Sequence, residues 1–172
     1  MAVATVVCEP LSAAAFAPFG QVLSAGLGQA AAANQGTAVR YDWAANLENL
    51  RPGARPNLAI FRSIARTLPL ELKLLERHPA STQAFLPLVV GRMLVCVAPT
   101  ADDGGPDLTG LRAFLGAPGQ GVNYALGVWH HPIVALDRDA DLAMLAWEDG
   151  TALDCLEHWF DAPRLVVEGS TA

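Results

Sequence analysis

The chain has 172 residues, of which 52% are hydrophobic and 16% are charged. It is therefore long enough for one domain with a sizeable core and too apolar to be disordered. Eleven Lys and Arg against seventeen Asp and Glu give a net charge of −6, which disfavours nucleic acid and anionic membranes as partners. No apolar run reaches the roughly 18 residues that span a bilayer.

The number and spacing of the cysteines bear on the cellular compartment in which the protein is expected. Cys8, Cys96 and Cys155 are odd in number and widely spaced, without a CxxC pair, so neither a disulfide framework nor a zinc cluster is indicated. The first ten residues lack the basic segment of a signal peptide. We therefore expect a cytoplasmic protein.

Residues 1–56 read as an N-terminal extension packed on the rest of a single domain, 1–172. The segment SAAAFAPFG (12–20) predicts a short helix that Ser12 caps and the following Pro and Gly end. The low-complexity stretch AGLGQAAAANQG (25–36) predicts a flexible Ala-rich loop.

From residue 57 the pattern changes to short apolar runs separated by turn sequences such as DDGGPD, APGQG and DRDAD. This spacing is typical of strands in an antiparallel barrel or sandwich. No long amphipathic helices separate the runs, which disfavours parallel βαβ units. The runs are NLAIFRSI, LELKLLERH, QAFLPLVV, MLVCVAP, RAFLG, GVNYALGVWHH, IVALD, LAMLAWE and DCLEHWF. We expect a mainly β fold with a few short helices.

The run LPLELKLLERHP carries a polar signal. Its even positions, from Leu68 to Leu74, are all leucine, so period-two alternation places them on the core face. The same parity places Glu76 and His78 on that face, unless the strand bends at Glu76. A buried carboxylate and imidazole must be paired, hydrogen-bonded or metal-bound, and a purely structural Glu–His pair is the alternative reading.

Three of the four histidines, together with Glu76 and Gln83, suggest a metal site. Glu76 and His78 stand two apart on one strand, Gln83 follows after a turn, and the pair His130–His131 comes about 50 residues later. Such an N/O set suits a divalent cation with open positions for substrate. Without a metal, Glu76 would be the general base, with its pKa raised by burial.

The spacing resembles the two cupin motifs. In the first, Glu76 and His78 take the two histidine places, Gln83 takes the glutamate place, and Gly91 stands one residue late for the closing glycine. The leading glycine is missing. The resemblance makes Glu76, His78, Gln83 and a later histidine the expected metal ligands.

In the second motif, Gly119, Ala125, Gly127 and His130 take the expected places, with only the proline replaced. Alternation points the adjacent His130 and His131 to opposite faces of a strand. The motif spacing favours His130 as the ligand, while His131 remains the candidate for moving a proton.

The amino-acid sequences of three segments resemble those of the ureidoglycolate lyase family, and the resemblance covers about residues 9–158. They are NQGTAVRYDWAANLE, LERHPASTQAFLPL and PDLTGLRAFLGAPGQGVNYALGVWHHPIVALDR. The resemblance implies a cupin-type antiparallel β-barrel (a double-stranded β-helix, or jelly roll) and a homodimer. It also implies cleavage of (S)-ureidoglycolate to glyoxylate and urea in allantoin and purine degradation, with nickel as the associated metal, although a metal-independent reaction stays open.

Several residues are candidates for holding the small anionic substrate. Arg40 and Tyr41 would bind its carboxylate, Arg40 through a bidentate fork, although a solvated surface charge is the alternative for Arg40. Gln83 at the cluster and Asn123 with Tyr124 in GVNYALG would line the pocket. Asn123 and Tyr124 read equally well as turn and core residues.

One departure concerns the substrate. Trp147 and Glu148 stand where the family tends to have Asp-Arg, so this chain lacks an arginine there. A different reaction on a small 2-hydroxy or 2-oxo acid, or a cupin domain that senses such an acid, is the alternative function. The sequence shows no helix-turn-helix pattern and no basic arm, which favours an enzyme.

Overall fold

The structure is a computed structural model and describes residues 4–169, so residues 1–3 and 170–172 of the predicted domain lie outside it. Strands dominate, and the helical elements are α1 (Ala13–Phe16) and the 3₁₀ turn η1 (Asn34–Gly36). The strands in chain order are β1 (Thr5–Pro10), β2 (Gly20–Leu23), β3 (Gln29–Ala33), β4 (Ala38–Asp42), β5 (Arg55–Ser63), β6 (Leu70–Arg77), β7 (Gln83–Val89), β8 (Met93–Ala98), β9 (Arg112–Gly116), β10 (Gly121–Tyr124), β11 (Trp129–His130), β12 (Val134–Ala135), β13 (Ala140–Glu148) and β14 (Leu156–Val167).

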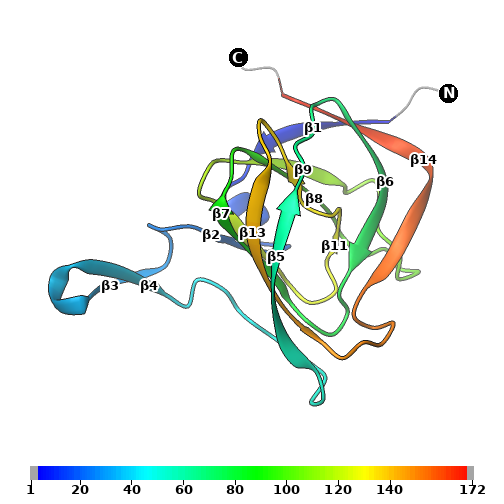
Figure 1. Cartoon of the computed structure of the whole chain (residues 1–172). Helices are drawn as coiled ribbons and strands as arrows, with labels where there is room; N and C mark the ends of the chain where they lie inside the picture. Colours follow the sequence, from blue (N-terminus) through cyan, green and yellow to red (C-terminus); the bar gives the residue numbers. More distant parts are fainter. Residues whose placement is uncertain (1–3, 170–172) are drawn as a thin grey trace.

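Two large sheets build the domain (Figure 1). The first has the order β11-β6-β14-β1-β9-β8-β12, and an additional β11–β8 pairing closes six of these strands into a barrel. The second has the order β2-β10-β7-β13-β5. The predicted mainly β barrel with short helices is confirmed, and each of the nine apolar runs contains a strand.

One strand departs from the predicted antiparallel arrangement. β1 pairs in parallel with both of its neighbours, β14 and β9. No tight hairpin joins β1 to either of them, so turn geometry does not dictate its direction.

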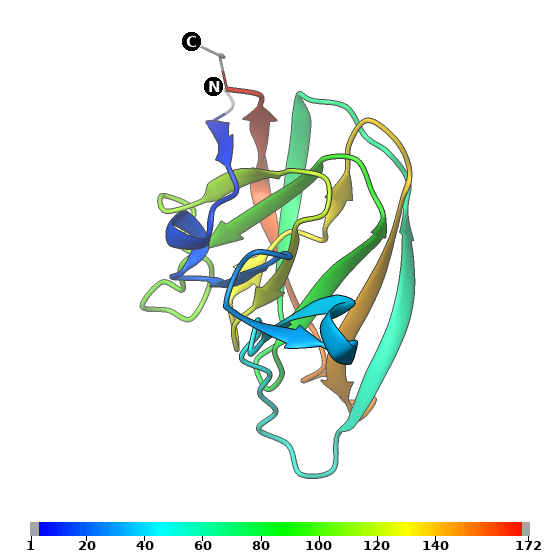
Figure 2. The same ribbon diagram turned by 90° about the vertical axis from the view of Figure 1, so that its left-hand side faces the viewer.

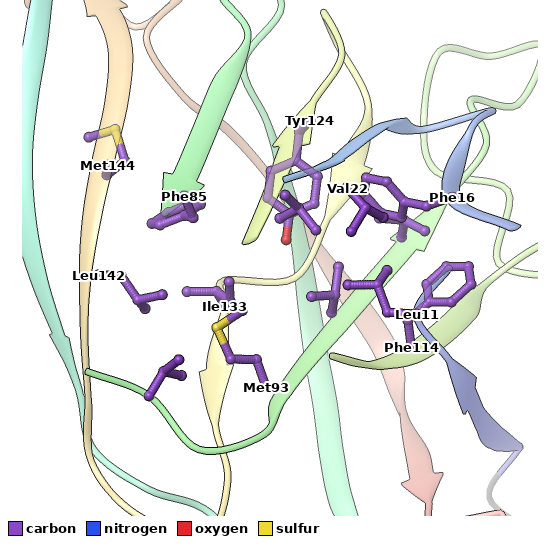
Figure 3. Packing of buried hydrophobic residues seen from close by; sticks show 14 of the residues in the cluster. Leu11, Phe16, Val22, Phe85, Met93, Phe114, Tyr124, Ile133, Leu142 and Met144 are labelled. Atoms are coloured by element: carbon purple, nitrogen blue, oxygen red, sulfur yellow. The ribbon is translucent and has the colours of Figure 1, made fainter. Parts of the chain in front are cut away.

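The interior contains two apolar clusters, and β8 is shared between them. Met93, Val95 and Val97 face the cluster between the two sheets. Figure 3 shows Met93 in this cluster together with Phe16, Phe85 and Phe114. The alternate residues Leu94, Cys96 and Ala98 face a second cluster formed by the strands of the closed barrel. Burial on both faces explains the unbroken apolar run MLVCVA.

The predicted N-terminal helix forms and contributes to the core. The Ser12 side chain caps α1 by accepting a hydrogen bond from the Ala15 backbone N–H at 3.2 Å. Phe16 is fully buried and meets Phe114 edge to face at 5.7 Å between ring centroids.

The predicted Ala-rich loop is different in the structure. Residues 29–42 form the antiparallel hairpin β3–β4, in which Ala31 pairs with Arg40. Figure 2 shows this hairpin projecting from the body toward the viewer. Alanine has low strand propensity, so composition predicts a loop, and the pairing with the second strand decides the outcome. Among the described residues, no helix is long and apolar enough to cross a membrane.

Candidate metal centre

Strand β6 carries Glu76, and the side chains of this strand do not follow simple alternation. Leu72 and Leu75, three positions apart, are both fully buried in the closed-barrel cluster. The partner strand β14 is irregular between Trp159 and Arg164, opposite this point. The prediction that Glu76 shares a face with Leu72 is therefore wrong, because the alternation shifts between them.

Glu76 and His78 nevertheless meet His130, and the ligand atoms of the three lie within 4.8 Å of one another. Glu76 on β6 pairs directly with His130 on β11. Gln83, the first residue of β7, brings its Oε1 to 3.2 Å from His130 Nε2, and Glu76 Oε1 lies 3.6 Å from the same nitrogen. The structure thus brings together the four residues that the motifs predict.

The hydrogen bonds of His78 leave one ring nitrogen free. Its Nδ1 donates to the backbone carbonyl of Asp154 at 2.5 Å, which places the proton on Nδ1. Its Nε2 is buried and has no hydrogen-bond partner among the described residues. A buried, unpartnered nitrogen lone pair beside a carboxylate is what a metal site requires.

His130 has the same arrangement. Its Nδ1 lies 2.9 Å from the Val128 carbonyl, to which it can donate, so the Nε2 of the neutral ring carries a lone pair toward Glu76 and Gln83 oxygens. Acceptor atoms that converge in this way need either a proton on His130 or a cation between them. The donor set therefore fits a divalent metal.

The pKa of Glu76 shifts in the opposite direction to the sequence prediction. Burial raises the pKa of Glu76, but the hydrogen bond and charge of His130, with smaller effects of His78 and Cys155, outweigh it and leave the pKa lowered. The predicted raised pKa is wrong because the imidazoles stabilise the carboxylate. Burial, with the charge of His130, lowers the pKa of His78.

Two neighbouring residues of β10 face opposite ways. The Tyr124 ring stacks on the His130 ring, with centroids 3.9 Å apart and planes 10° apart. Its hydroxyl is buried and finds no hydrogen-bond partner within residues 4–169. Asn123 donates instead to Gln21 Oε1 at 2.8 Å and to the Asn46 carbonyl at 3.0 Å. Tyr124 therefore belongs to the wall of the cluster, while Asn123 fastens the segment around Asn46 to the sheet.

Of the two adjacent histidines, His130 points into the cluster. His131 is partly exposed, its Nδ1 lies 2.7 Å from the Pro132 carbonyl, and its backbone N–H donates to Cys96. Burial of its ring lowers the pKa of His131.

The pair predicted to bind the substrate carboxylate lines a groove that is separate from the cluster. Arg40 and Tyr41 lie on the projecting hairpin and line an apolar groove of about 560 Å³. Arg40 is paired with Asp42 at 2.8 Å. The residues that line this groove do not include any of the four cluster residues, so substrate binding by Arg40 and Tyr41 stays a prediction.

Sequence reasoning missed the contribution of the loop before β14. Cys155 brings its Sγ to 3.7 Å from Glu76 Oε2, and Asp154 supplies the carbonyl that holds His78. Burial and the negative charge of Glu76 raise the pKa of the Cys155 thiol to about 12. A motif search has no signal for a backbone carbonyl, which any residue type can supply.

A closed β-barrel that brings a carboxylate and two imidazoles together is the arrangement of a cupin-type protein. Comparison with known proteins makes the assignment specific, because the ureidoglycolate lyase family model matches residues 3–168. The chain belongs to the ureidoglycolate lyase family.

Individual relatives agree with this family. A ureidoglycolate lyase of Pseudomonas fluorescens is 40% identical over 165 residues, covering 95% of this chain and 96% of that protein. One of Burkholderia mallei is 43% identical over 141 residues, covering 82% and 81%. Among solved structures, a dTDP sugar isomerase of Desulfovibrio desulfuricans is similar with a TM-score of 0.49 and 15% identity, covering 78% and 82%.

Proposed function

We propose that this protein cleaves (S)-ureidoglycolate to glyoxylate and urea at the cluster of Glu76, His78, Gln83 and His130. The observation that carries the proposal is the convergence of Glu76, His78 and His130 ligand atoms within 4.8 Å in a chain of this family. With this activity the protein would act in allantoin and purine degradation, and we propose the cytoplasm as its location.

Cleavage of ureidoglycolate requires a proton transfer. Ureidoglycolate has a hydroxyl and a urea nitrogen on one carbon, so cleavage moves the hydroxyl proton to the departing nitrogen while the C–N bond breaks. If no metal is bound, Glu76, ionised at neutral pH because its pKa is lowered, accepts the hydroxyl proton. In this metal-free reaction His130, 3.6 Å from the carboxylate, passes a proton to the urea nitrogen, and His131 is a further candidate for this transfer with or without a metal.

A divalent metal, with nickel as the first candidate, would be held by Glu76, His78 and His130, with the Gln83 amide oxygen beside them. When bound, such a cation supplies a Lewis acid that lowers the pKa of a coordinated hydroxyl. A neutral Gln83 in place of a carboxylate leaves the site less negative, which suits an anionic substrate. The unpartnered Nε2 of His78 supports this proposal.

A direct assay tests the function. Purified protein is incubated with racemic ureidoglycolate, with and without chelator, and glyoxylate and urea are measured. We expect urea above the spontaneous background, and we expect His78→Ala to lose both activity and bound metal. Absence of urea with metal restored would overturn the proposed lyase activity, whereas activity that survives thorough chelation would leave Glu76 as base and remove the metal.

We also propose a homodimer, and the outer face of the second sheet is the surface that supports it. Leu58 and Ile60 on β5 are 72% and 64% exposed, and Leu86 and Leu88 on β7 are 48% and 57% exposed. Strand β13 lies between β5 and β7, so these four residues form one apolar face. The groove lined by hairpin residues borders this face at Leu86. Contiguous exposed apolar surface of this kind marks an interaction site, and a second copy is the partner that the family resemblance implies.

A further inference from the structure

Arg51 lies outside the cluster, at the start of the turn before β5, yet it is the centre of an ionic network. Its guanidinium reaches Asp149 Oδ1 at 2.6 Å, Asp154 Oδ1 at 2.7 Å and the Trp147 carbonyl at 2.9 Å. The side chain is only 13% exposed. One planar group therefore joins the end of β13 to the loop 149–155.

The backbone of Arg51 is itself held in place. Its N–H donates to Asn49 Oδ1 at 3.0 Å, and the Asn49 amide donates back to the Arg51 carbonyl at 2.8 Å. The neighbouring Leu50 N–H donates to the Ala80 carbonyl at 2.9 Å. The guanidinium thus projects from a backbone anchored beside the segment that joins β6 to β7.

The loop held by Arg51 touches the cluster at two points. Asp154 accepts from the backbone N–H groups of Asp149 and Gly150 through its carboxylate, and its own carbonyl accepts the proton of His78 Nδ1. The next residue, Cys155, lies against Glu76. A shift of this loop would release the histidine that donates to it.

We infer that Arg51 is a positioning residue that keeps His78 in the tautomer with its proton on Nδ1 and its Nε2 free to face the cluster. This inference rests on the proposed site but not on turnover. Partners that hold the outer nitrogen of such a histidine typically contribute 10- to 100-fold to metal affinity or activity. Asp149, Asp154 and Trp147 already engage the guanidinium, so its role is to hold the loop rather than to bind substrate.

The test reads the tautomer directly. Long-range ¹H–¹⁵N spectra of the histidine rings are recorded on chelator-treated protein at pH 8, and His78 is assigned from the spectrum of His78→Gln. We expect the Nδ1-protonated form in the unchanged protein and a shift toward the Nε2-protonated form in Arg51→Ala. In the lyase assay, kcat is expected to fall on the order of 10- to 100-fold with a smaller change in KM.

Arg62→Ala is the matched control, because Arg62 makes a bidentate pair with Asp141 at 2.8 Å on an exposed part of β5. It should leave both the His78 tautomer and kcat unchanged. Asp154→Asn serves as a second variant if Arg51→Ala does not fold, since it weakens the ion pair and keeps the carbonyl. A folded Arg51→Ala or Asp154→Asn protein with an unchanged His78 tautomer would overturn the inference, even if the lyase proposal failed separately.

Discussion

At the scale of single residues, the site depends on where a few protons reside. His78 and His130 each have Nδ1 within hydrogen-bond distance of a backbone carbonyl, so both present Nε2 to the same small volume. Sequence spacing identified these histidines, but spacing does not contain the carbonyls that orient the rings. Motif spacing favoured His130 over His131, and in the structure His130 is the one that faces the cluster.

Tyr124→Phe tests the hydroxyl above His130. Because the hydroxyl is buried and has no hydrogen-bond partner in the described part of the chain, its removal is expected to leave the free energy of unfolding unchanged or to raise it by about 1 kcal/mol. If the substrate supplies the missing partner, KM should rise while stability does not fall. Urea unfolding and steady-state kinetics measure the two effects, and a large loss of stability would contradict this account.

Acid should weaken the fold through two imidazoles, the buried ring of His78 and the partly buried ring of His131. The pKa values of His78 and His131 are lowered from 6.5 by burial, so the unfolded chain binds more protons than the folded one below that pH. The stabilisation is fully present above about pH 6.5 and declines as the pH falls below it. Urea unfolding of chelator-treated protein at pH 7.5 and 5.5 should show this loss, and His131→Gln should reduce it. Equal stability at both pH values would refute the expectation.

At the scale of elements, close strand packing requires a glycine in β10. A Cβ on Gly121 would lie 2.2 Å from the Phe85 carbonyl oxygen of the adjacent β7. This oxygen belongs to the backbone, so it cannot move away as the end of a flexible side chain could. The glycine is therefore needed for the pairing that positions Tyr124 over His130.

Gly121→Ala should accordingly destabilise the protein by about 3 kcal/mol, at the upper end for overpacking. Gly53→Ala is the matched control, because nothing lies within 4 Å of its added Cβ, and its effect should stay within about 0.5 kcal/mol. Chemical denaturation curves compare the two. Similar midpoints for both variants would show that β7 and β10 can separate without cost.

Elements from residue 57 onward were predictable because short apolar runs between turn sequences are characteristic of strands. The elements before it were not, apart from α1. The strand β3 is almost all alanine, and β1 pairs with strands more than 100 residues away in sequence. Neither feature leaves a local pattern.

At the scale of the whole molecule, the apolar outer face of the second sheet predicts the oligomeric state. Sedimentation should give twice the 18.1 kDa of one chain, and Ile60→Glu should shift the protein toward the monomer, because the new charge lies within the apolar face. Val7→Glu, at a 59% exposed position on the other sheet, is the control and should remain a dimer. A monomer in the unchanged protein would refute the homodimer.

The amino-acid sequence by itself determined a single acidic β domain, its strands beyond residue 57 and the four residues of the cluster, since apolar periodicity and motif spacing are local properties of the chain. The tertiary structure decided which face Glu76 occupies and how Arg51 and Asp154 hold His78. These depend on a bulge in a partner strand and on backbone carbonyls from distant segments. Such contacts exist only once the sheets have closed, so no pattern of residue types encodes them.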